Sequence, residues 1–235
     1  MEKLIGEPLF YIFFIYGLSF LLMAYLIIKG ARAVSSVPLI IAFYMLALFG
    51  LTHGVTEIVD WIRFIVKTLG VAEIRTLTYV SQIFLVVSFV FLLQFGVNLL
   101  TYRLENRGAY RAIPLILVGV YSAVILVLGI TDILRIGLIG RYSFGFAGAL
   151  LSSIALFVMG NTMKPLGNQK LDRGLTIAAA GFVCYAVFGG LIITPIAGIP
   201  IQLFRSACAV TIAFAAFSVI DIYQYVESKK EPAIR

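Results

Sequence analysis

Long apolar runs alternate with short polar breaks along the whole chain. About 20 consecutive apolar residues are enough to cross a bilayer as a helix, and seven runs reach that length. The runs cover residues 8–29, 37–62, 77–101, 112–134, 143–164, 173–195 and 200–226. This pattern predicts an all-α, polytopic membrane protein, a seven-transmembrane-helix bundle. We expect one transmembrane domain over residues 1–227 and a short charged cytoplasmic tail over 228–235.

Two of the breaks have unusual composition. Helical periodicity continues beyond the second run, from Asp60 to Lys67. The helix therefore either rises out of the membrane or turns into a short interfacial helix before Gly70, as an interfacial anchor or as a lid over a ligand. The sixth break is short and uncharged, and Pro195 and Pro200 end one helix and start the next.

Composition and charge agree with a membrane protein. The chain is 62% hydrophobic and 12% charged, whereas soluble domains are about 25% charged. Eleven of the 18 Lys and Arg residues fall in the odd-numbered breaks and the tail. The positive-inside rule then predicts the N-terminus outside and the C-terminus in the cytoplasm. This placement accounts for the net charge of +7 without a nucleic-acid partner, and the lipid bilayer is the expected partner.

A faint internal similarity is present. Residues 43–51 in the second run resemble residues 182–190 in the sixth, and Gln82 near the start of the third helix parallels Gln202 near the start of the seventh. This is compatible with a 3+1+3 parallel repeat, in which helices 1–3 and 5–7 flank the fourth.

A polar stripe interrupts the second apolar run. His53, the only histidine, is followed by Glu57 and Asp60 at helical spacing, with Trp61 next to them. Residues three and four apart lie on one face of a helix. Ionisable groups are costly in lipid, so such a face normally lies toward a bundle interior or a wet cavity.

The predicted topology brings further polar residues to the outer ends of helices. Asp132 ends the fourth helix, and Gln202 and Arg205 lie in the first turns of the seventh. A buried arginine needs an acidic partner, so we expect Arg205 to pair with Glu57 or Asp132. The group is either a structural polar network that fixes the helix register or a ligand pocket open to the outside, lined by helices 2, 4 and 7, and the two are compatible.

The residues limit the chemistry. His53 and Glu57 form a workable pair of metal ligands on one helix face, but only as a weak metal candidate. A single histidine excludes bis-histidine haem and leaves a single-histidine haem or a quinone pocket near Trp61 open; the sequence requires no cofactor. The seventh helix has no lysine before Lys229 for a retinal Schiff base. No catalytic motif accompanies Ser152 or Ser153, so we do not expect an enzyme.

Four segments resemble the seven-helix N-terminal sensor region of bacterial membrane histidine kinases and diguanylate cyclases. They are residues 14–18, 47–54 together with Glu57, 144–150 and 198–205. The resemblance implies a prokaryotic multi-pass protein of the inner, cytoplasmic membrane that senses a small or membrane-borne signal. It also implies roles for His53, Glu57, Gln202 and Arg205, which match motif positions.

No kinase, cyclase or PAS segment follows Arg235. We therefore expect a sensory module that relays a helix shift to a separate cytoplasmic or membrane signalling partner, and a homo-oligomer is compatible with this. Two other functions remain open: a quinone- or haem-associated redox subunit, and a small-solute transporter. The transporter predicts a site near the bilayer midplane, whereas the polar residues gather toward one side.

Overall fold

Helices account for most of the residues that the structure describes. The computed structural model describes residues 6–32, 36–71, 75–102, 104 and 107–230. Its elements in chain order are α2 (Pro8–Ala31), α3 (Val37–Thr68), α4 (Arg75–Leu100), α5 (Arg107–Arg111), α6 (Ile113–Val127), α7 (Ile133–Gly140), η1 (Arg141–Phe146), α8 (Ala147–Met163), η2 (Lys164–Leu166), α9 (Gln169–Tyr185), η3 (Ala186–Leu191) and α10 (Ile201–Lys230). The elements η1 and η3 are π-helical, and η2 is a 3₁₀ turn.

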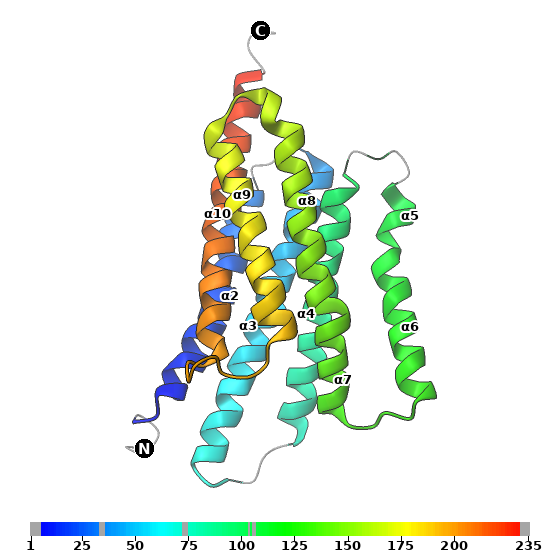
Figure 1. Ribbon diagram of the computed structural model, residues 1–235, viewed down its shortest axis with the longest axis vertical. Coiled ribbons are helices and arrows are strands. Elements are labelled where there is room, and N and C mark those ends of the chain that lie inside the picture. The colour runs from blue at the N-terminus through cyan, green and yellow to red at the C-terminus, as the bar shows by residue number, and fades with distance from the viewer. Residues whose placement is uncertain (1–5, 33–35, 72–74, 103, 105–106, 231–235) are drawn as a thin grey trace.

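Among the described residues, seven helical segments are long and apolar enough to span a membrane, which confirms the predicted all-α bundle. The fifth span combines α7, η1 and α8, and the sixth combines α9 and η3. The segments alternate in direction, so the two termini lie at opposite ends of the bundle (Figure 1). We call these the N-terminal end, where α2 begins, and the C-terminal end, where α10 ends.

The boundary between the fourth and fifth spans differs from the expected one. The fourth apolar run was expected to continue to residue 134, but α6 ends at Val127 and α7 begins at Ile133. Gly129 has φ +60°, a left-handed backbone that glycine adopts easily, and Asp132 accepts a hydrogen bond from Leu134 N as the N-cap of α7. Asp132 therefore starts the fifth span instead of ending the fourth.

Two helices extend beyond their expected limits. The second spanning helix, α3, continues unbroken to Thr68, and Gly70 with φ +73° follows it. The segment from Asp60 to Lys67 is therefore a continuation of the second spanning helix and not a separate short helix. The last helix, α10, runs to Lys230, so residues 228–230 of the predicted tail are helical. Residues 231–235 of that tail lie outside the described residues.

The core lies between α2, α3, α4, α8, α9 and α10, whereas α6 stands apart at one side (Figure 1). Only Pro114 is buried among the residues of α6. The other helices approach one another closely through small residues; a methyl group on Gly50 of α3 would come within 2.9 Å of Phe20 O on α2. Close backbone approach through glycine is a common way to pack helices in lipid, where water does not drive association.

The contact between η1 and η3 gives a first testable prediction. A Cβ on Gly190 would lie 2.7 Å from Phe146 Cα, a backbone atom that cannot rotate away. We expect Gly190→Ala to lower the free energy of unfolding in detergent micelles by about 1–3 kcal/mol, as overpacking does. The matched control is Gly119→Ala in α6, where nothing lies within 4 Å and the change should raise stability by about 0.5–1 kcal/mol. Equal effects at the two sites would contradict this packing.

Candidate functional site

His53 lies at the centre of a buried aromatic cage. It occupies the middle of α3 and is completely inaccessible to solvent. Its ring centroid lies 4.4 Å from that of Phe20 on α2, 5.3 Å from that of Phe49 on α3 and 5.4 Å from that of Phe89 on α4. These apolar rings exclude water, so every polar contact of the imidazole must come from the protein.

Both ring nitrogens of His53 have partners. Nδ1 lies 3.0 Å from the Ser88 hydroxyl, which itself donates to Leu85 O at 2.7 Å. Because Ser88 has one proton and donates it to Leu85, its oxygen accepts from Nδ1–H. Nε2 lies 3.2 Å from the hydroxyls of both Tyr16 and Tyr185. In the neutral ring this nitrogen is an acceptor, so a tyrosine hydroxyl donates to it.

Glu57 lies one helical turn from His53. Its Oε1 is 3.6 Å from His53 Nε2, and the residue is 4% exposed. The carboxyl group lies within electrostatic range of Asp60, Arg141 and Arg205. The α3 stripe predicted from helical spacing is thus buried at His53 and Glu57.

Two arginines cap the end of the sixth span. Arg205 on α10 donates from Nε to Phe188 O at 2.6 Å and from Nη2 to Ile192 O at 2.7 Å. Arg141 donates from Nη1 to Gly189 O at 2.7 Å. The last carbonyls of a helix have no partner within the helix, and the two cations also face the negative end of its dipole. The two guanidinium groups therefore satisfy groups that lipid could not.

The expected ion pairs of Arg205 do not form. Within the described residues, neither Glu57 nor Asp132 approaches Arg205 to ion-pair distance, and the guanidinium hydrogen-bonds to backbone carbonyls. The physical reason is that η3 ends next to α10, so its unpaired carbonyls lie nearer to Arg205 than any carboxylate does. The carboxylate of Glu57 acts on Arg205 only at longer range.

Asp60 and Trp61 lie nearer the N-terminal end than Glu57. Asp60 Oδ1 accepts hydrogen bonds from Arg63 Nη1 and from Ser81 Oγ on α4, both at 2.7 Å. The indole of Trp61 packs between Phe10 and Phe14 of α2, with ring centroids 5.3 and 5.0 Å away. The Trp61 Nε1 atom is buried and has no hydrogen-bond partner among the described residues.

Asp132 and Gln202 remain outside the His53 network. Asp132 is exposed, caps α7 and lies 3.6 Å from Arg135 Nε. Gln202 is half-buried in the first turn of α10, and its backbone carbonyl accepts from Ser206. No described residue hydrogen-bonds its side-chain amide. His53, Glu57 and Arg205 therefore lie around Tyr185 and η3, whereas Asp132 and Gln202 do not belong to this network.

Four network residues were not singled out from the sequence: Tyr16, Ser88, Arg141 and Tyr185. Tyr16 belongs to an aromatic-rich helix in which nothing distinguishes it from its neighbours. Arg141 falls in the fourth break of the hydrophobic pattern, because the fourth run ends at residue 134 and the fifth begins at 143. In the structure the segment 133–140 before it belongs to the fifth span. The one feature of the sequence that could have identified Arg141 is that this apolar segment can extend the fifth span.

Two clefts lie at the N-terminal end. The first has a volume of about 280 Å³ and is lined by Phe13, Asp60, Arg63, Phe64 and Lys67. The second has a volume of about 380 Å³ and is lined by Arg63, Arg75, Thr78, Tyr79, Asp132, Ile133 and Leu134. They share Arg63 and are formed by α2, α3, α4 and the start of α7. This differs from the expected pocket between the second, fourth and seventh helices, because α6 stands apart and Arg205 is engaged with η3.

The structure brings no further metal-binding side chain to the His53 and Glu57 pair. Among the described residues, no group of three or more His, Cys, Asp and Glu side chains could hold a metal ion together. A protein site for a transition metal generally needs three or four such ligands.

Comparison with known proteins leaves the chain without an assigned family. It matches no protein-family model, no curated protein and no solved structure.

Proposed function

We propose that this protein is a membrane-embedded sensory module. It binds a small ligand at the N-terminal end, outside the cell, and relays a shift of α10 to a cytoplasmic or membrane partner. The motif resemblance to bacterial sensor regions favours this function, and so does the position of the clefts. The observation that carries it is a continuous line of polar groups from the first cleft to α10.

The line runs along α3. Asp60 lines the cleft, and Glu57 and His53 follow at successive turns into the core. The hydroxyl of Tyr185 lies 3.2 Å from His53 Nε2, and Tyr185 is the last residue of α9 before η3. The carbonyls at the end of η3 hold Arg205. A displacement of Asp60 by a ligand would therefore change the electrostatic environment of each group in turn.

The output element is α10. It continues without interruption from the Arg205 contact to Lys230, beyond the last residue of its apolar span, Ile222. A helix transmits a displacement along its axis because its backbone hydrogen bonds keep it stiff. The π-helical segment η3 is an element in which a register change is physically accessible, and π-helical turns recur at functional sites. Ligand binding would then favour one of two packings of η3 and α10.

The cleft suggests the ligand class. Phe13 and Phe64 supply apolar surface and Lys67 a positive charge on this cleft, where Arg63 is paired with Asp60. A small molecule with an apolar body and an anionic group fits this lining. Redox and transport functions have no comparable support from the geometry of the described residues.

The test uses Trp61, the only tryptophan, whose ring lies between α2 and α3 next to this cleft. Purified protein would be titrated with a panel of aromatic and aliphatic carboxylates, sulfonates and phosphates while Trp61 fluorescence and thermal unfolding are followed. For a panel member that binds, we expect Lys67→Gln to weaken affinity about three- to tenfold through loss of one ionic contact. Arg135→Gln, another exposed cation at this end but outside both clefts, should leave affinity unchanged.

The relay is measured separately. Spin labels at exposed positions 25 on α2 and 221 on α10, in a chain without Cys184 and Cys208, report the distance between these helices by pulsed electron paramagnetic resonance. We expect a panel member that binds to change this distance. Binding that is equally strong in Lys67→Gln would rule out the cleft, and binding without a distance change would rule out the relay.

A further inference from the structure

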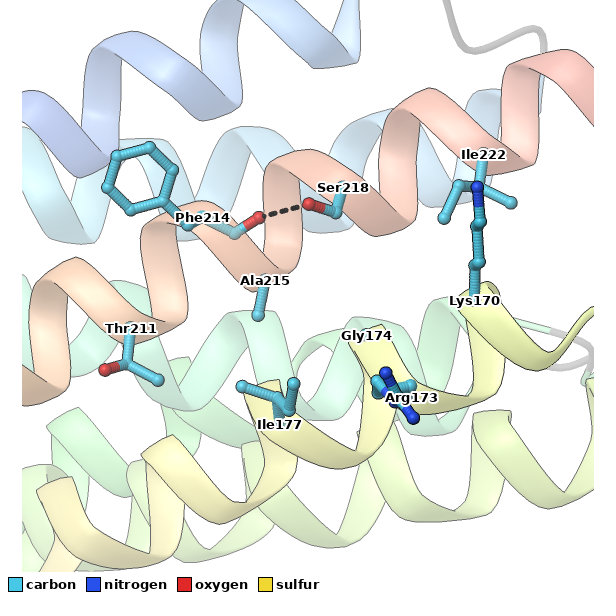
Figure 2. A pocket seen from close by; sticks show the side chains of 9 residues that line it. All are labelled: Lys170, Arg173, Gly174, Ile177, Thr211, Phe214, Ala215, Ser218 and Ile222. Atoms are coloured by element: carbon cyan, nitrogen blue, oxygen red, sulfur yellow. Dashed lines mark hydrogen bonds between the residues drawn. The ribbon is translucent and has the colours of Figure 1, made fainter.

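Another cavity lies at the opposite end of the bundle from the two N-terminal clefts, on the surface between α9 and α10. It has a volume of about 440 Å³. Its lining residues are Lys170, Arg173, Gly174, Ile177, Thr211, Phe214, Ala215, Ser218 and Ile222 (Figure 2). We call it the α9–α10 groove. None of its residues belongs to the His53 network or to the N-terminal clefts.

The groove has two chemically different parts. Lys170 and Arg173 are exposed in the first two turns of α9, at the C-terminal end, and no acidic residue is among the described residues that line the groove. Within the described residues, neither cation forms an ion pair. Figure 2 shows Lys170 reaching from α9 toward Ile222 on α10, so the positive charge lies at the mouth. The rest is apolar, with Ile177 43% and Phe214 55% exposed along the walls.

The Ser218 hydroxyl adds little polarity to the groove. Ser218 Oγ donates back to Phe214 O at 2.8 Å within α10, as Figure 2 shows, so its proton is already engaged. Gly174 and Ala215 keep the floor low between the two helices. The result is an apolar channel with a cationic end.

The dimensions fit one leaflet of a bilayer. From Thr211 to Ile222 the α10 wall is about 16 Å long, at 1.5 Å per residue. Half of a hydrocarbon core of about 30 Å is about 15 Å. With Lys170 and Arg173 at headgroup depth, an acyl chain lying in the groove would reach approximately the bilayer midplane.

A second apolar cavity continues the groove beyond that point. It shares Ile177 and Thr211 with the first and extends to Phe188 and Phe204, with a volume of about 380 Å³. None of the described residues that line it is charged. The cationic site thus belongs to one leaflet only, the one at the C-terminal end.

We propose that the α9–α10 groove binds one anionic phospholipid, with its phosphate on Lys170 and Arg173 and an acyl chain between α9 and α10. Basic residues at the membrane surface beside an intramembrane groove select anionic headgroups by charge. A second copy of the chain is a poorer occupant in a parallel arrangement, because Lys29, Lys164 and other cations would meet their counterparts at this end. The proposal does not depend on the sensory function.

The experiment counts lipids. The protein would be placed in nanodiscs of phosphatidylglycerol and phosphatidylcholine in equal amounts, released, and weighed by native mass spectrometry. We expect the wild type to retain one phosphatidylglycerol in preference to phosphatidylcholine. The double variant Lys170→Gln/Arg173→Gln should lose about fivefold in affinity for each cation, and so about 25-fold in total.

A matched control has the same charge change at the same end. Lys29 and Arg32 are also exposed cations three residues apart, at the end of α2 and outside the groove. Lys29→Gln/Arg32→Gln should bind phosphatidylglycerol within about twofold of the wild type. The same loss in both double variants would show that general surface charge is responsible, and would overturn the proposal.

A steric pair tests the acyl-chain part without changing charge. Thr211→Leu adds bulk to the groove lining at its uncharged end, whereas Thr176→Leu is an equivalent change at an exposed α9 position outside it. We expect Thr211→Leu to reduce phosphatidylglycerol retention at least fivefold and Thr176→Leu to leave it unchanged. Equal retention of both lipid types by the wild type, or a dimer that Thr211→Leu dissociates, would overturn the assignment of this groove to an anionic lipid.

Discussion

Arg205→Ala should lower the free energy of unfolding in detergent micelles by about 3 kcal/mol. The side chain is 5% exposed and donates two hydrogen bonds of 2.6 and 2.7 Å to carbonyls at the end of η3. Hydrogen bonds to charged groups contribute about 1.5–3 kcal/mol each to the stability of soluble proteins. In a membrane protein each bond contributes less, because the unfolded state also finds hydrogen-bond partners. Truncation removes the guanidinium from which both partly buried carbonyls accept.

The comparison with two other variants separates the role of Arg205 from that of charge alone. Arg205→Lys keeps the cation but lacks the planar fork that reaches two carbonyls at once, so it should recover only part of the loss. Arg135→Ala removes a guanidinium whose side chain is 77% exposed, and it should change stability by less than about 0.5 kcal/mol. A loss at Arg135 as large as that at Arg205 would contradict the capping of η3.

His53→Ala should have a similar effect, again about 3 kcal/mol in the free energy of unfolding. The change leaves a cavity between Phe20, Phe49 and Phe89, and cavities of this kind are costly in themselves. It also removes the ring nitrogen that lies 3.2 Å from the buried Tyr16 and Tyr185 hydroxyls, so these hydroxyls lose a hydrogen-bond partner. Denaturant titration followed by circular dichroism measures the loss.

The neighbouring Thr52 provides the control. Its hydroxyl donates only to carbonyls of its own helix, Leu48 O at 2.7 Å and Phe49 O at 3.3 Å. Thr52→Ala should therefore cost less than about 1 kcal/mol. His53→Gln, which keeps polar atoms near Ser88, should fall between the two. If His53→Ala were as mild as Thr52→Ala, the network around the imidazole would not contribute to stability.

The polar stripe shows how far sequence reasoning reaches into this site. Helical spacing alone places His53, Glu57 and Asp60 on one face, and the cost of charge in lipid turns that face inward. The side chains that contact this face could not be predicted in the same way. Tyr16 and Tyr185 are 37 and 132 residues from His53 in the chain, and no local pattern connects them.

Arg205 shows why the remaining contacts were mispredicted. Its burial follows from its place in an apolar helix, and a carboxylate was the natural partner to expect. The backbone carbonyls of η3 took that place because α9 ends in a π-helical segment beside α10, which depends on how the sixth span terminates. Asp132 lies outside the group because the chain turns at Gly129, which has φ +60°. Asp132 is therefore at the start of the fifth span and not at the end of the fourth.

By itself, the sequence determined that this is an all-α membrane protein with seven helices, and that one face of α3 is polar. Hydrophobic length and helical periodicity are local properties, so they can be read without knowing the fold. Only the tertiary structure decided which side chains surround His53, that Arg141 and Arg205 cap η3, and that Lys170 and Arg173 lie at the end of an apolar groove. These features depend on helix ends and on close packing between segments far apart in the chain, where differences of a few ångströms determine the partner.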